Sequence, residues 1–63
     1  MNMTEAQKKN LQALVEAGAE VSTVAYNPST VVGDPEGAAV SAGWVQFQRE
    51  ASSSLVEVVY TRT

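Results

Sequence analysis

Two stretches in the C-terminal third of the chain decide the fold: residues 43–49, Gly-Trp-Val-Gln-Phe-Gln-Arg, and residues 54–62, Ser-Leu-Val-Glu-Val-Val-Tyr-Thr-Arg. Each alternates its side chains with the period of two that a β-strand requires. In the first stretch, Val45 and Phe47 share one face. The second stretch places three apolar side chains on one face: Val56, Val58 and Tyr60. Ala51 and the serines at positions 52–54 link the two stretches, so we expect a β-hairpin.

A third strand is expected earlier in the chain, at residues 20–26, Glu-Val-Ser-Thr-Val-Ala-Tyr. This segment is rich in β-branched and aromatic residues, which fit a half-buried pleated surface. It ends at the pair Asn27-Pro28, which marks a turn. The sequence therefore predicts a sheet of three antiparallel strands.

The N-terminal segment carries the signals of a helix. Thr4 is a good N-cap, and Gln7 lies three residues later, which completes a capping-box pattern. Gly18 stands where a helix ends most easily in a left-handed residue. An apolar stripe at helical spacing lies between these signals, formed by Leu11, Leu14 and Val15. We therefore expect a helix between Thr4 and Gly18.

Residues 27–42 leave two alternatives open. Residues 33–37, Gly-Asp-Pro-Glu-Gly, are a strong turn signal. We expect residues 31–32 to pair with residues 38–40 across this turn, as a short extension of the sheet. The alternative is a loop of about sixteen residues, and loops of that length are uncommon in small domains unless they are functional or mobile.

These elements predict one α+β domain over residues 1–63, in which an N-terminal helix packs on one face of a three-stranded antiparallel sheet. The helix stripe is expected on the face that holds Val24, Tyr26, Val45, Phe47, Val56, Val58 and Tyr60. The other face is expected to stay open, and to carry Trp44, Leu55 and Val59 among Gln46, Gln48, Glu57 and Thr61.

The composition removes most catalytic chemistry. The chain has no histidine and no cysteine, so disulfides are impossible and the usual zinc ligands are missing. Histidine is also the commonest general base, and no nucleophile has a base of the usual kind. Asp34 and Glu36 are the nearest carboxylate pair, which leaves a metal-dependent hydrolase as the catalytic alternative. We expect a protein that is not an enzyme and that has no cofactor and no metal site.

Charge and hydropathy restrict the partners. The net charge is −3, and no lysine or arginine lies between Asn10 and Gln48. Phosphate contacts need clustered cations, so direct nucleic-acid binding and docking on anionic membranes are not expected. The sequence has no apolar run long enough to span a bilayer, and the N-terminus lacks a signal-peptide layout, so we expect a cytoplasmic protein.

The surface is the remaining clue. Five acidic residues have no obvious neutralising cation apart from Arg49 beside the fourth of them: Glu20, Asp34, Glu36, Glu50 and Glu57. They are either ordinary solubilising charge or a surface that attracts a basic DNA-binding groove and competes with DNA for it. Trp44 is either an apolar anchor for a partner or a side chain that folds over the core.

In size, composition and expected fold class, this short, cysteine-free, mildly acidic α+β chain resembles the small proteins with which phages disable bacterial defence. Its order of elements, ending in Trp44-Val45-Gln46-Phe47 and in residues 55–60, is similar to that of a type I-C anti-CRISPR protein. The resemblance implies a stoichiometric inhibitor in the bacterial cytoplasm that binds the CRISPR surveillance complex and blocks target DNA. The alternative is a small homodimeric structural or adaptor subunit that uses the open sheet face. The chain itself is expected to be a monomer or a homodimer.

Overall fold

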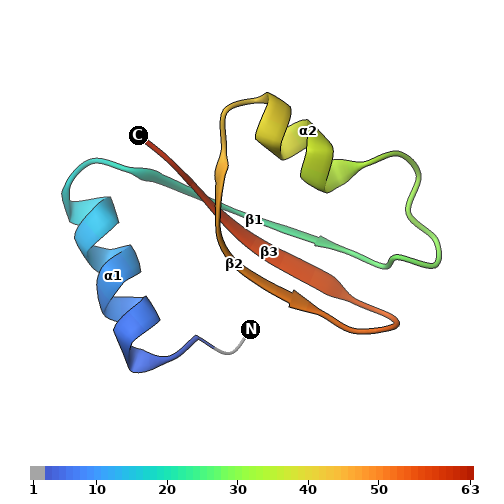
Figure 1. Ribbon diagram of the computed structural model, residues 1–63, viewed down its shortest axis with the longest axis horizontal. Coiled ribbons are helices and arrows are strands. Elements are labelled where there is room, and N and C mark those ends of the chain that lie inside the picture. Colours follow the sequence, from blue (N-terminus) through green and yellow to red (C-terminus); the bar gives the residue numbers. More distant parts are fainter. Residues whose placement is uncertain (1–2) are drawn as a thin grey trace.

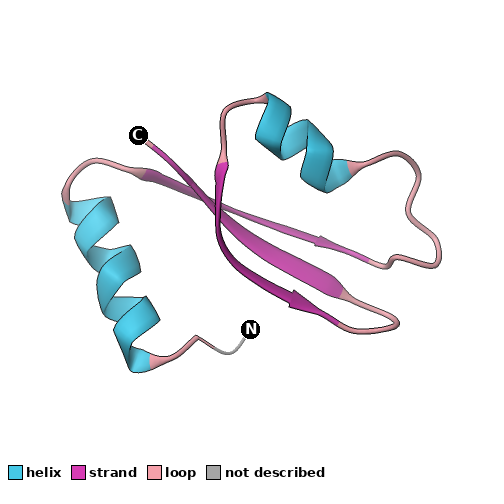
Figure 2. Ribbon diagram, viewed as in Figure 1, coloured by secondary structure: helices cyan, strands magenta, loops and turns pink. Residues whose placement is uncertain are grey.

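The middle of the molecule is a three-stranded antiparallel sheet in the order β1-β3-β2. The computed structural model describes residues 3–63 and shows two helices beside this sheet (Figures 1 and 2). The elements in chain order are α1 (Glu5–Glu16), β1 (Glu20–Tyr26), α2 (Pro35–Ser41), β2 (Val45–Ala51) and β3 (Val56–Arg62). The α+β class and the three antiparallel strands are confirmed, and α2 is an additional element.

Helix α1 forms from the signals at its ends. The Gln7 amide donates to Thr4 Oγ1 at 3.1 Å, and the Thr4 amide donates to Gln7 Oε1 at 2.9 Å, which is the predicted capping box. The chain leaves the helix through Gly18 at φ 99°, a left-handed conformation that glycine adopts without steric cost. Local chemistry therefore sets both ends of this helix.

Residues 27–42 contain α2 in place of the expected hairpin extension, so that prediction is wrong. Asp34 is the N-cap of α2, its side chain accepts from the Gly37 amide at 3.0 Å, and Pro35 occupies the first helical position. An acidic cap followed by proline starts a helix well, because the missing proline N–H would have been unpaired there in any case. Val32, expected in a strand, is 96% exposed in the loop before the helix.

A β-bulge in β2 reassigns its side chains. Phe47 is the extra residue, since Gln46 lies opposite Tyr60 while Gln48 lies opposite Val59. The residues of β2 that precede the bulge are therefore shifted to the opposite face. Val45 lies on the face of Val59, and Gln46 lies on the face of Tyr60. The prediction that Val45 shares a face with Tyr60 is wrong, because an extra residue inverts the alternation.

The core lies on one face of the sheet. We call it the covered face, defined by Val24, Tyr26, Val56, Val58 and Tyr60. The three β3 residues are at most 3% exposed, and Ala39 of α2 and Trp44 pack against them. Helix α2 therefore takes the place that was predicted for α1. Within α1 no residue is buried, and Val15 is half exposed.

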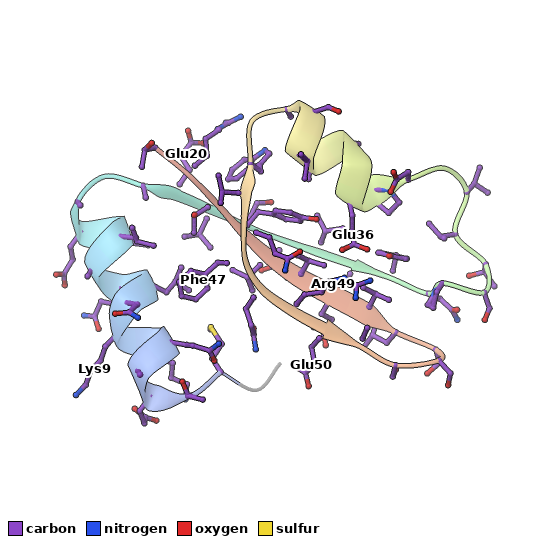
Figure 3. The ribbon with its side chains drawn as sticks, viewed as in Figure 1. Lys9, Glu20, Glu36, Phe47, Arg49 and Glu50 are labelled. Atoms are coloured by element: carbon purple, nitrogen blue, oxygen red, sulfur yellow. The ribbon has the colours of Figure 1, made fainter. Side chains whose placement is uncertain are left out.

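Helix α1 lies apart from α2 in Figure 1, and Phe47 points from β2 toward α1 in Figure 3. The molecule is thin, with extents of 36 × 25 × 10 Å. Its radius of gyration is 12.3 Å, against about 10.6 Å for a compact domain of this length.

Within residues 3–63, neither helix has the length and apolar character needed to cross a membrane.

Candidate protein-binding surface

A network of three side chains joins α2 to both outer strands. The Arg49 guanidinium holds Glu36 with two hydrogen bonds, Nε to Oε1 at 2.7 Å and Nη2 to Oε2 at 3.2 Å. The Tyr26 hydroxyl donates to the same Oε2 at 2.5 Å. Glu36 and Arg49 face each other across the covered face in Figure 3. The network therefore positions α2 over the middle strand, between β1 and β2.

The network sets the protonation of its members. The Arg49 guanidinium, and then the Tyr26 hydroxyl, lower the pKa of the Glu36 carboxyl. The hydrogen bond to Glu36 raises the pKa of the Tyr26 phenol, because a phenolate could not donate to the carboxylate. The same carboxylate raises the pKa of Arg49. The negative charge of Glu36 is thus matched within the chain.

Glu20 and Trp44 belong to a second network, centred on Arg62. Arg62 Nη2 lies 3.2 Å from Glu20 Oε2, and Nη1 donates to the Ala42 carbonyl at 3.3 Å. The guanidinium stacks over the Trp44 ring, 4.2 Å from its centroid. The expectation that Trp44 lies on the open face is wrong, because the indole packs against the covered-face core.

The last two acidic candidates lie together on the other side of the sheet. Glu50 and Glu57 are directly opposite each other in the β2–β3 ladder. An open hollow of about 130 Å³ at this end of the hairpin is lined by both glutamates and by Ala51, Ser52 and Leu55. This end of the hairpin is therefore acidic, with an apolar residue at its edge.

Exposed apolar residues accompany the glutamates. Val21 of β1 and Val45 of β2 both lie opposite Thr61, so they share the face of Glu50 and Glu57. Val21 is 39% exposed and Val45 65%, and Leu55 in the hairpin loop is 43% exposed. Val59 of β3 lies on the same face, but it is 3% exposed, so the expectation that this residue stays open is wrong. We define the five other residues as the open face: Val21, Val45, Leu55, Glu50 and Glu57.

The structure separates the predicted site residues into groups. Glu36 is held by Arg49, Glu20 by Arg62, and Asp34 is a helix cap, while Glu50 and Glu57 remain together on the open face. Among the described residues, no group of three acidic side chains is arranged to hold a metal ion. Asp34 and Glu36 in particular serve the start of α2 and the Arg49 network.

Sequence reasoning missed Tyr26, Arg49 and Arg62 as partners of the acidic residues. Arg49 lies 13 residues after Glu36, and Arg62 lies 42 residues after Glu20. The usable signal was scarcity, since these two arginines are the only cations after Lys9. Both arginines pair with an acidic side chain in the structure.

Comparisons with protein-family models, with curated proteins and with solved structures found no match to this chain. The arrangement on the open face is therefore interpreted from its own chemistry. A surface that combines exposed apolar residues with carboxylates is suited to contact with a protein surface.

Proposed function

We propose that this chain is a non-catalytic binding protein that docks through its open face onto a basic surface of a larger protein complex. The observation that carries the proposal is the asymmetry of the sheet. One face is packed by α2 and Trp44, while the other buries Val59 but presents exposed Val21 and Val45 toward one end, and Leu55 with Glu50 and Glu57 toward the other. A partner would bury the apolar residues and pair the carboxylates with its own cations.

Of the five acidic candidates, we assign Glu50 and Glu57 to partner binding. Glu20 and Glu36 each have an arginine of the same chain within 3.2 Å, so the charge of each is matched by that arginine. Glu50 and Glu57 are adjacent carboxylates on one face, and their potentials add toward the solvent. Their expected contribution is to steer association with a positive surface, whereas the apolar residues supply the contact area.

The resemblance to type I-C anti-CRISPR proteins suggests the partner. A CRISPR surveillance complex has a basic channel that receives target DNA, and a small acidic protein docked there would prevent DNA from entering. In this form the chain acts as a stoichiometric inhibitor in the cytoplasm of a phage-infected bacterium. It has no chemistry of its own to perform and needs no cofactor.

The experiment measures binding of the purified chain to a purified type I-C surveillance complex, together with binding of target DNA. We expect binding that excludes DNA and weakens from about 50 mM to about 500 mM salt, since exposed charges are screened. The double variant Glu50→Gln and Glu57→Gln should bind about tenfold more weakly.

The matched control removes the same two charges elsewhere. Glu5→Gln and Glu16→Gln lie on α1, where both residues are exposed, and give the same net charge as the test variant. We expect the control to bind like the original chain. An equal loss in both double variants would show that only net charge matters, and binding that does not change with salt would contradict the electrostatic role of the open face.

A further inference from the structure

The two edges of the sheet differ in a way that points to a second copy of the chain. The strand order leaves β1 and β2 each with one outer edge that no strand pairs with among residues 3–63. An unpaired edge offers a row of backbone donors and acceptors to any extended chain. The two edges differ in whether the strand carries features that block pairing with another chain.

Strand β2 carries the features with which proteins block such edges. It has the bulge at Phe47, which interrupts a regular ladder, and the charged pair Arg49 and Glu50. Strand β1 has none of these features. Its seven residues pair with β3 without a shift in register, and the six from Val21 to Tyr26 carry no charge and no proline.

The outer edge of β1 is also left uncovered by the helices. The Glu36 contacts with Tyr26 and Arg49 hold α2 over the middle of the sheet. Among the described residues, β3 is the one element that packs extensively along β1.

We infer that two copies of the chain pair antiparallel through β1, and form one continuous six-stranded sheet. A twofold register centred on Thr23 places Val21 opposite Ala25 of the second copy, a branched side chain beside a small one. It places Glu20, which is held by Arg62, near the uncharged Tyr26 of the second copy. No like charges meet along this interface, so the edge is electrostatically compatible with itself.

Edge pairing also fits the charges better than stacking of the open faces. Stacking would remove Glu50 and Glu57 of both copies from water, and desolvating carboxylates is costly. In the edge-paired dimer both open faces stay exposed on the same side of the sheet. The dimer would then present two equal open faces on one side of the six-stranded sheet.

The test is the molar mass of the chain in solution as a function of concentration, by sedimentation equilibrium. One seven-residue strand pair is a small interface, so we expect a dissociation constant on the order of 0.1 mM. The average mass should rise toward twice the 6.7 kDa of one chain. A mass that stays at 6.7 kDa up to about 1 mM would overturn the inference.

Variants identify the edge. Thr23→Lys places two lysines face to face in the dimer and should weaken association by about tenfold or more, while Gln46→Lys adds the same charge to an exposed position of β2 and should leave association intact. Circular dichroism establishes that each variant is folded, and Ala25→Lys replaces Thr23→Lys if the latter is not. Association of the β1 variants at the original strength would contradict pairing through this edge.

A mixed-label NMR sample distinguishes the two geometries. Intermolecular contacts between Val21 and Ala25 are expected from edge pairing. Intermolecular contacts from Val45 or Leu55 would instead indicate stacking of the open faces, and would overturn the inference. Neither result depends on whether a partner complex binds the chain, so this test and that of the proposed function can fail independently.

Discussion

The two faces of the sheet use the same strands for different purposes. On the covered face, Val58 and Tyr60 are almost fully buried under α2 and Trp44, and Glu36 joins α2 to both outer strands. On the open face, Val21 and Val45 remain exposed and two glutamates lie side by side. The difference indicates that most of the buried core lies on one face, while the other face buries Val59 and keeps the valines of its outer strands exposed.

The largest expected effect breaks the covered face. Tyr60→Ala removes the largest fully buried side chain and should cost about 3–4 kcal/mol. A domain of this size has roughly 3–5 kcal/mol in total, so the variant should be mostly unfolded. Val45→Ala on the open face should change stability by less than about 0.5 kcal/mol. Urea unfolding followed by circular dichroism measures both, and similar losses would contradict the division between the faces.

The next effect concerns the helix that covers the core. Asp34→Ala removes the cap of α2, which accepts from the Gly37 amide, and should lower the free energy of unfolding by about 1 kcal/mol. Asp34→Asn is the matched control, because asparagine caps a helix as well as aspartate does. If both variants were equally destabilised, charge and not the cap hydrogen bond would be the cause.

A pH dependence should follow from Glu36. Its pKa is lower in the folded chain than its ordinary value of 4.5, so its stabilising contribution is complete above that pH and is lost as the pH falls through the folded value. The urea midpoint should therefore decrease on acidification, and it should decrease less in Glu36→Gln. Equal pH profiles for the two proteins would show that the Arg49 network does not stabilise the fold.

Tyr26 gives the corresponding effect at high pH. Its pKa is raised above 10.0 in the folded chain, so its contribution is present below that pH and is lost as the pH rises through the folded value. The alkaline limb of the same stability profile should be flatter in Tyr26→Phe, which cannot ionise. A phenylalanine variant with the alkaline limb of the original chain would contradict this role.

The smallest expected effect has the opposite sign. Glu57 faces Glu50 across the ladder, and like charges directly opposite each other destabilise a sheet. Glu57→Gln should therefore stabilise the chain by about 0.2–0.5 kcal/mol, while it weakens binding to a basic partner. We expect Glu57→Gln to gain stability and to lose binding, because Glu57 is proposed to serve binding and not stability. Loss of both would indicate a structural role for this carboxylate.

The sequence predicted the parts of the fold that depend on neighbouring residues. The Thr4 and Gln7 capping box, Gly18, and the limits of β1 are all local signals, and the structure has them where they were expected. Helix α2 was missed because Asp-Pro-Glu-Gly suits both a turn and a helix start. A seven-residue helix is not stable by itself and exists here through its contacts with the sheet.

The candidate site was less predictable because it depends on pairing over long distances in the chain. The bulge at Phe47 exchanges the faces of Val45 and Gln46, and alternation alone cannot reveal an extra residue. The contacts from Arg49 to Glu36 and from Arg62 to Glu20 join residues that are far apart in the sequence. Those contacts become visible only once the strand order is known.

The most direct test of the central claim is to map the contact surface by NMR. The isotope-labelled chain is titrated with substoichiometric amounts of the purified type I-C surveillance complex, and the loss of each amide signal is measured. We expect little change in α2 and the strongest losses at Val21, Val45, Glu50, Leu55 and Glu57. Losses concentrated on α2 and on the loop before it would contradict the assignment of binding to the open face.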